Sequence, residues 1–343
     1  MSDPLFPGNR RFTWFTSAGR RATQYEAYTI GQQPNLEPWL HVDWPVRFDD
    51  GRPPWAAEST AARCSRWGEF RDPTQTWQRP YVAQHNHHEQ ALAALVPEAM
   101  RWGLSETIVP VWRDVVLGRY YAAWPFVEYG EFRCLCYAVR QALADTITFS
   151  LAFEVSDKAR HSQDIIHYLL TLKKTHEGFS DESARGAWLT DPVLVPLRET
   201  IERVHSLSDW VEIAVAINLV LEPLAGDLFK TEFLARLAPL NGDAVTPIIL
   251  ASVRRDGERH IAATKALVRL LTGDPVHGES NRELVRAWVA KWQPHAHTAA
   301  NALGALFVLD GITSIPFAPQ LERVLSRQRE VLAGLGLEMG DST

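Results

Sequence analysis

The sequence predicts an all-α protein built around one helical bundle, and three observations support this prediction. From Tyr81 onward, apolar residues recur at helical spacing, and no segment shows the sustained two-residue alternation that marks strands. Helix-breaking prolines gather instead in the first 80 residues, which hold nine of the 21. A pattern of five residues, Asp-x-x-Arg-His, occurs twice, 99 residues apart, each time inside a long helical segment.

Composition and charge exclude several classes of protein. With 343 residues, 46% of them hydrophobic and 22% charged, the chain can bury a core. Its formal charge of −6, without a basic block, argues against nucleic acid as a partner. No apolar leader and no run of 18 apolar residues is seen, and three cysteines make no disulfide framework. We therefore expect a cytoplasmic protein that does not contact the membrane.

Two regions differ in composition. Residues 1–80 hold six of the 13 tryptophans beside their prolines, and we interpret them as an extended arm. Large aromatic side chains of this kind bury about 150–250 Å² each when they dock. The surface on which they dock is either the chain's own bundle or a partner subunit. Residues 81–343 form the second region, a helical domain.

The helical domain is expected to contain its elements in the following order. Helical segments are expected at 91–96, 109–126, 131–172 (one or two helices), 193–207, 209–240, 244–271, 282–292, 298–309 and 319–332. Pro223 is expected to kink the segment 209–240. Asn241-Gly242-Asp243 reads as a turn with a capping residue, Gly273-Asp274-Pro275 as a stop, and Gly334 as the end of the last helix.

The repeated Asp-x-x-Arg-His pattern suggests a chemistry. The copies are Asp157–His161 and Asp256–His260, and each follows a glutamate on an earlier apolar helix, Glu131 and Glu222 respectively. Two helix pairs repeated in this way predict a four-helix bundle with pseudo-twofold symmetry. In ferritin-like di-iron bundles, two helices supply one glutamate each and the other two supply Glu-x-x-His.

The ligand set for such a di-iron centre is incomplete here. Glutamate would be needed at positions 158 and 257, where the sequence has Lys158 and Gly257. We therefore expect a ferritin-like bundle without a metal centre. Its degenerate ligand positions are Glu131, Lys158, His161, Glu222, Gly257 and His260.

Several motifs resemble the hydroxylases of bacterial multicomponent di-iron monooxygenases. The iron-binding half of that family is similar to 218–222 (Asn-Leu-Val-Leu-Glu), 241–243, Thr246-Pro247 and 256–260. Other segments resemble the small β subunit of that family. They are Phe70-Arg71-Asp72-Pro73 with Trp77 and Tyr81, and the N-terminal stretches 11–16 (Arg-Phe-Thr-Trp-Phe-Thr), 20–23 (Arg-Arg-Ala-Thr) and Tyr25-Glu26. The resemblance covers most of the chain and points to the propane and alkene monooxygenase branch.

This resemblance implies a non-catalytic structural and regulatory β subunit with no catalytic residue and no cofactor of its own. The di-iron centre is expected in the α subunit of an α₂β₂ core, with a γ subunit in some branches. A coupling protein and an NADH-dependent flavin/iron–sulfur reductase are the further partners, and a small hydrocarbon or alkene is the substrate class. The aromatic arm is expected to clasp α through Trp14, Phe15, Arg20, Arg21, Tyr25, Trp39 and Trp44.

Lys158 is the residue that argues most directly against iron, because an ammonium group repels a divalent cation. We hypothesise that Lys158 is instead the counter-ion of Glu131 or Glu222 in the bundle interior, since buried carboxylates need a partner. The alternative is that Lys158 extends to solvent and pairs with nothing.

Two rival functions remain open at this point. One is a divergent di-iron oxidase in which Asp157 or Glu258 replaces the missing carboxylates, although each lies about 100° from the ligand face. The other is an unrelated helical scaffold. A further polar stretch, 85–89 (His-Asn-His-His-Glu), is interpreted as the start of a helix rather than a metal site.

Overall fold

The computed structural model describes residues 21–30, 49, 51 and 56–338, and all regular secondary structure in these residues is helical. The all-α prediction is confirmed for this part of the chain. The α-helices are α1 (Gln24–Tyr28), α3 (Gln78–Arg101), α4 (Ala122–Gln141), α5 (Asp145–Thr175), α6 (Ser183–Thr190), α7 (Val195–His205), α8 (Trp210–Val215), α9 (Thr246–Thr272), α10 (Gly278–Leu303) and α11 (Phe317–Ala333).

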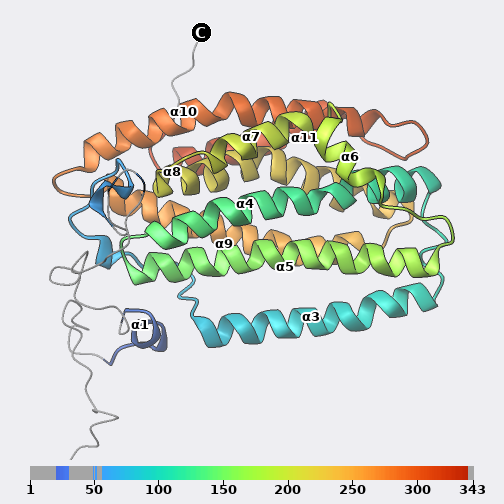
Figure 1. The fold of residues 1–343 in the computed structure, drawn as a ribbon, viewed down its shortest axis with the longest axis horizontal. Helices are drawn as coiled ribbons and strands as arrows, with labels where there is room; N and C mark the ends of the chain where they lie inside the picture. Colours follow the sequence, from blue (N-terminus) through green and yellow to red (C-terminus); the bar gives the residue numbers. More distant parts are fainter. Residues whose placement is uncertain (1–20, 31–48, 50, 52–55, 339–343) are drawn as a thin grey trace, which may run out of the picture.

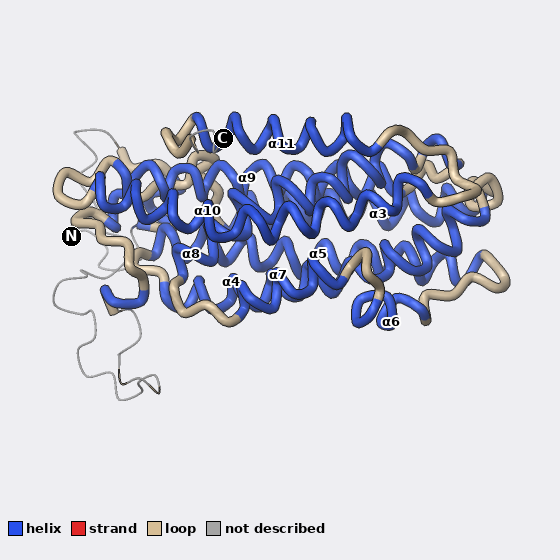
Figure 2. The backbone as a smooth tube through the Cα atoms, turned by 90° about the horizontal axis from the view of Figure 1, so that it is seen from above, coloured by secondary structure: helices blue, strands red, loops and turns tan. Residues whose placement is uncertain are grey.

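Helices α4, α5 and α9, and α8 with the helical segments that continue it, form the centre of the molecule and run along its long axis (Figures 1 and 2). Helix α4 packs on α5 and α8, while α9 packs on α5 and on the helical segments that continue α8. The predicted four-helix core is therefore present. Helix α3 lies along the outer side of α5, and α10 covers the opposite edge together with α7 and α11 (Figure 1).

Three segments of these helices are π-helical: η4 (Trp112–Tyr121), which leads into α4, and η5 (Ala216–Gly226) and η6 (Leu228–Ala235), which continue α8. A π-helix widens the turn and changes which side chains share a face. Pro223, where a kink was expected, lies inside η5. The irregularity in this segment is therefore a wide helical stretch around Pro223, in which most side chains are buried.

Two expected helix breaks are wrong. Helix α4 runs without interruption through residues 126–131. Gly130, inside this stretch, lets α7 approach closely, since a β-carbon there would lie 2.5 Å from Ile201 Cγ2. The break falls later, at Ala142–Ala144, before α5. Helix α10 likewise continues through Pro294, since buried side chains such as Trp292 and Ala296 hold it on both sides. Helix α6 was not expected.

The expected turns and stops are confirmed. Gly242 has φ +77°, and a β-carbon there would lie 2.0 Å from the carbonyl oxygen of Thr107, so only glycine fits. Asp243 follows it and accepts hydrogen bonds from the backbone N–H groups of Val245 and Thr246 at the start of α9. Gly273 ends α9 and Gly334 ends α11.

Residues 56–77 pack against this chain's own helices. Asp209, which caps α8, also accepts a hydrogen bond from Ala61 N–H at 2.7 Å. Asn281 of α10 donates to the carbonyl oxygen of Arg63 and accepts from its N–H group. Helix α3 begins at Gln78, three residues before the predicted start of the helical domain. In the described residues, no helix has the length and apolarity needed to cross a membrane.

Candidate functional site

The four central helices bring together a buried group of charged side chains, here called the lysine–carboxylate cluster. It consists of Glu128 and Glu131 from α4, Lys158 from α5, Glu222 from η5 and Lys230 from η6. Lys158 is 1% exposed, and Glu128 and Glu131 are each 1% exposed. An ammonium group this deep in a protein is stable only beside opposite charge.

Lys158 is the centre of the cluster. Its Nζ lies 2.5 Å from Glu131 Oε2, 2.5 Å from Glu222 Oε1 and 3.4 Å from Glu128 Oε2. The question of which glutamate Lys158 pairs with is thus answered: it contacts both predicted partners and a third carboxylate. Lys230 Nζ lies 2.6 Å from Glu222 Oε2 and 3.6 Å from Glu128 Oε1.

Burial and neighbouring charges set the protonation states. Burial by itself favours the neutral form of every member, yet the surrounding carboxylates raise the pKa of Lys158 well above its ordinary value and also raise that of Lys230. The two ammonium groups in turn lower the pKa values of Glu128 and Glu222 despite their burial. Burial and the adjacent Glu222 raise the pKa of Glu131 well above its usual range. Opposite charges thus shift the pKa values of four members toward their charged forms, while the pKa of Glu131 shifts toward its neutral form.

The two Asp-x-x-Arg-His copies pair with each other across α5 and α9. Asp157 Oδ2 lies 2.9 Å from His260 Nε2 and also contacts Arg259. Asp256 Oδ2 lies 3.2 Å from His161 Nε2 and also contacts Arg160. Each aspartate therefore contacts the histidine of the opposite helix and an arginine, which for Asp157 is Arg259 of the opposite helix and for Asp256 is Arg160 of the opposite helix, and Asp157 additionally lies 3.7 Å from Arg160 of its own helix. The pseudo-twofold symmetry predicted from the repeat is present in these contacts.

The two aspartates orient the histidines. His161 turns its other ring nitrogen, Nδ1, toward Glu128 Oε2 at 3.4 Å, which links the crossed pairs to the lysine–carboxylate cluster. Burial alone lowers the pKa of His161, but hydrogen bonds to Asp256 and Glu128 outweigh it and raise the pKa. Carboxylates that fix a histidine ring in this way are typical of the surroundings of metal sites.

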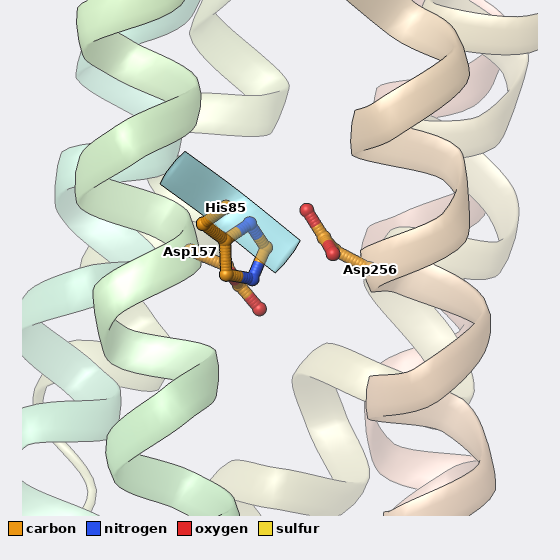
Figure 3. Close-up of side chains that lie close together, drawn as sticks. All are labelled: His85, Asp157 and Asp256. Carbon is orange, nitrogen blue, oxygen red and sulfur yellow. The ribbon is translucent and has the colours of Figure 1, made fainter. Parts of the chain in front are cut away.

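Helix α3 adds a third layer to the crossed pairs. His85 Nε2 lies 3.2 Å from Asp157 Oδ1, and the Tyr81 hydroxyl donates to the same oxygen at 2.9 Å. Figure 3 shows His85 beside Asp157, with Asp256 facing them from α9. These three residues have the spacing of a metal-binding group, but both aspartates already contact arginines. The stretch 85–89 was expected to be the start of a helix. It lies instead inside α3, which begins at Gln78.

A cavity of about 190 Å³ reaches the cluster between η5, η6, α9 and α11. Lys158, Glu222, Lys230 and Gly257 all line it. No atom lies within 4 Å of the place where a β-carbon on Gly257 would be, so the side chain missing at this ligand position leaves open space. At Gly226, by contrast, a β-carbon would lie 2.2 Å from Glu222 Oε2, so the Glu222 side chain would have to move.

The structure brings the six degenerate ligand positions together around the cluster and the cavity. Most of the predicted arm residues cannot be placed in this way, because they lie outside the described residues: Trp14, Phe15, Arg20, Trp39 and Trp44. Arg21 is exposed. Tyr25 is buried, and its hydroxyl accepts a hydrogen bond from Asp72 N–H at 2.9 Å.

Two members of the cluster were missed from the sequence. Glu128 lies one helical turn before Glu131, and that i, i+3 spacing was a usable signal. Lys230 follows Glu222 by eight residues, which in an α-helix would place it about 80° away around the axis. The π-helical backbone of η5 and η6 alters this register, and nothing in the sequence indicated it.

Comparison with known proteins now places the chain. Residues 44–275 match the model of the family described as Methane/Phenol/Alkene Hydroxylase. The chain belongs to this family. As a whole it is similar to the propane 2-monooxygenase hydroxylase component small subunit of Rhodococcus jostii (strain RHA1), with 32% identity over 97% of this chain and 91% of the relative. The chain is thus a small, or β, subunit of a multicomponent monooxygenase hydroxylase, and the resemblance noted from its motifs is confirmed.

Other relatives extend the comparison of this small subunit. The methane monooxygenase component A beta chain of Methylococcus capsulatus (strain ATCC 33009 / NCIMB 11132 / Bath) is 31% identical, and the match covers 84% of this chain and 76% of the relative. Among solved structures, a chain of xenon-pressurized phenol hydroxylase from Pseudomonas sp. OX1 has a TM-score of 0.80 at 19% identity. That match covers 92% of this chain and 91% of that one. At this identity the structural match establishes a shared fold.

Proposed function

We propose that this small subunit is the non-catalytic β subunit of a soluble di-iron monooxygenase hydroxylase. In this role it supports an α subunit that oxidises a small hydrocarbon or alkene with O₂ and electrons derived from NADH. Its similarity to subunits of a propane 2-monooxygenase and a methane monooxygenase supports the substrate class. The di-iron centre belongs to α in this proposal, and this chain has a structural and regulatory role.

The position of Lys158 is the observation that carries the proposal. A di-iron centre requires carboxylates and imidazoles that converge on free space. Here the carboxylates of Glu131 and Glu222 converge on an ammonium group, each at 2.5 Å, and Gly257 offers no ligand atom. The residues present do not fit iron, so no step of the reaction is assigned to this chain.

The contacts of the substitute carboxylates count against a divergent di-iron oxidase. Asp157 is engaged by Arg259, His260 and His85. Glu258 is largely exposed and pairs with Arg254 at 3.0 Å. Neither carboxylate joins the cluster. The other rival, an unrelated helical scaffold, is excluded because the chain belongs to the hydroxylase family.

In the assembled enzyme, we propose an α₂β₂ core, with a γ subunit where the branch has one, located in the cytoplasm. A coupling protein and an NADH-dependent flavin/iron–sulfur reductase complete the system. An apolar groove of about 480 Å³ between α4 and α5 supports a subunit role, since apolar surface is commonly covered in an assembly. At its rim, Tyr129 is 57% exposed and Ile166 is 46% exposed.

Metal analysis of the chain alone and in complex tests the proposal. The chain is purified by itself and co-expressed with its α partner, and iron is measured per chain in both preparations. We expect no stoichiometric iron in the chain alone, and iron that follows α in a stable complex. About two irons in the isolated chain would instead make it an oxygenase in its own right.

The arm carries the second part of the proposal, that residues 1–80 clasp α through the aromatic and arginine side chains named above. Tyr25 already packs in this chain, so a deletion of residues 1–20 tests Trp14, Phe15 and Arg20 without removing α1. We expect this deletion to prevent co-purification with α while the thermal unfolding of the helical domain is unchanged. Full assembly and turnover after the deletion would contradict the clasp.

A further inference from the structure

The lysine–carboxylate cluster has the connectivity of two cations bridged by carboxylates. Glu222 places one oxygen 2.5 Å from Lys158 Nζ and the other 2.6 Å from Lys230 Nζ. Glu128 does the same at longer range, with its two oxygens 3.4 Å from Lys158 Nζ and 3.6 Å from Lys230 Nζ. Of the two ammonium groups, Glu131 forms an ion pair with that of Lys158, at 2.5 Å. Two carboxylates thus bridge the ammonium groups, and one is terminal.

We propose that the ammonium groups of Lys158 and Lys230 occupy the two cation positions of a carboxylate-bridged centre, and that removing the Lys158 ammonium turns the cluster into a divalent-cation site. This inference goes beyond the proposed subunit role and concerns only side chains of this chain. If the cation-site inference fails, the proposed β-subunit role still stands. If the β-subunit role is contradicted, the cation-site inference still stands.

The donor set that remains without Lys158 suits a divalent transition metal. Glu128, Glu131 and Glu222 each offer an oxygen, and these three oxygens lie within 4.8 Å of one another. His161 does not belong to this group of three, but its Nδ1 lies 3.4 Å from Glu128 Oε2, so its imidazole is a neighbour of the carboxylates. Carboxylate and imidazole donors together suit Fe²⁺, Co²⁺ and Zn²⁺.

The surroundings of His161 are already those of a metal ligand. Its Nε2 lies 3.2 Å from Asp256, so the ring is held with Nδ1 toward the cluster. A carboxylate behind a histidine fixes the orientation of the ring, and such outer partners matter to metal affinity. The supporting interactions of a cation site are therefore present beside Lys158.

The tethered ammonium explains why the native chain would exclude a metal. Lys158 Nζ sits at the point where the carboxylates converge, and a divalent ion could bind only by displacing it. The covalent tether keeps the ammonium group at high local concentration. Lys230, 2.6 Å from Glu222, would additionally repel an incoming divalent ion.

A route to the cluster exists on the side of α9. The 190 Å³ cavity is lined by both Lys158 and Lys230 at its inner end and by Arg254 and Glu258, both exposed, at its outer end. The absent side chain of Gly257 leaves part of this space open. A small hydrated ion can therefore reach the position of Lys158 without unfolding of the bundle.

Cobalt binding by the full-length Lys158→Ala variant tests the inference. Co²⁺ is titrated into the native chain and the variant, with calorimetry for affinity and visible absorption for coordination. We expect the variant to bind one Co²⁺ per chain and to gain thermal stability with added Co²⁺, while the native chain does neither. A matched control, Lys291→Ala, removes a surface lysine paired with Glu212 and is expected to gain no site.

Two further variants test the ligands of the Co²⁺ site and provide a second test if Lys158→Ala does not fold. Lys158→Ala combined with Glu131→Gln and Glu222→Gln is expected to lose the Co²⁺ site. If Lys158→Ala does not fold even with Co²⁺, Lys230→Ala is measured, since its ammonium group is at the cavity and bridges the same carboxylates. Stoichiometric Co²⁺ in the native chain overturns the inference. So does absence of Co²⁺ binding, and of stabilisation by Co²⁺, in both single variants.

Discussion

Lys158 illustrates how one side chain sets the character of a buried site. Its ammonium group brings a positive charge into the core, at a position where we predict that a di-iron bundle would carry a glutamate. The three surrounding carboxylates keep it charged, and Lys230 completes the balance. A buried ion pair is not necessarily stabilising against an apolar alternative, but removing one partner is costly. Substituting Lys158 alone should therefore lower the free energy of unfolding.

We predict that Lys158→Met lowers the free energy of unfolding by about 3–5 kcal/mol at neutral pH. In the native protein, Lys158 lowers the pKa of Glu222, so that carboxylate stabilises the fold above its unfolded-state pKa. Without the Lys158 ammonium, Lys230 alone opposes the effect of burial, so the folded-state pKa of Glu222 rises, and the stability penalty of the variant grows with pH up to that raised pKa. Urea unfolding at pH 7 and pH 4.5 should show a smaller penalty at the lower pH. Equal stability of variant and native protein at pH 7 would contradict the counter-ion role.

At the scale of elements, the π-helical segments are supported by α11. Gln328 is fully buried, donates a hydrogen bond to the carbonyl oxygen of Leu219 in η5 at 3.0 Å, and accepts one from Gln293 of α10. Arg327, its neighbour, contacts Asp227 and Glu232 at 2.6 Å and 2.7 Å. Helix α11 thus holds the wide turns that bring Glu222 and Lys230 to one side. The geometry of the cluster depends on a helix that contributes nothing to it directly.

We predict that Gln328→Leu destabilises the protein by about 1–3 kcal/mol, because the buried carbonyl oxygen of Leu219 and the half-buried amide of Gln293 each lose a partner. Arg329→Ala, one residue further along α11, is the control. That side chain is 64% exposed and pairs at the surface with Glu322, so its loss should change stability by less than about 0.5 kcal/mol. Chemical unfolding of both variants makes the comparison. Equal effects of the two substitutions would argue against the support of η5 by α11.

At the scale of the whole molecule, residues 56–77 connect the ends of three helices. Asp209 at the start of α8, Asp274 after α9 and Asn281 in α10 each bind the backbone of this segment. Asn281 is 1% exposed and bonds both polar backbone groups of Arg63. The described part of the arm is thus attached to this chain's own bundle.

We predict that Asn281→Ala releases this attachment and makes the segment accessible to trypsin at Arg63, Arg66 and Arg71. Digestion of the native protein and the variant under native conditions, followed by mass spectrometry, measures the change. Ser280→Ala provides the control, because Ser280 is exposed and bonds only within the turn before α10. Identical cleavage of the native protein and Asn281→Ala would show that the attachment does not depend on Asn281.

Much of the fold follows from local physics and was predictable. Helical periodicity identified the class, and Gly242 with Asp243 marked the start of α9, because left-handed backbone and capping depend on residues close in sequence. The misplaced break before Glu131 depended instead on contact between Gly130 and α7, which periodicity does not record. The predicted boundary at residue 81 falls within three residues of the start of α3.

The sequence by itself determined the family, the four-helix core, and the presence of Lys158 and Gly257 where a di-iron ligand set would need glutamate, since these are read from residue identity and spacing. Only the tertiary structure decided that Lys158 is shared among three glutamates, that Lys230 joins it, and that the two Asp-x-x-Arg-His copies pair crosswise. The physical reason is that charge pairing acts through space between helices. The partner of a buried ion is chosen by packing and by the wide turns of η5 and η6, which leave no regular period in the sequence.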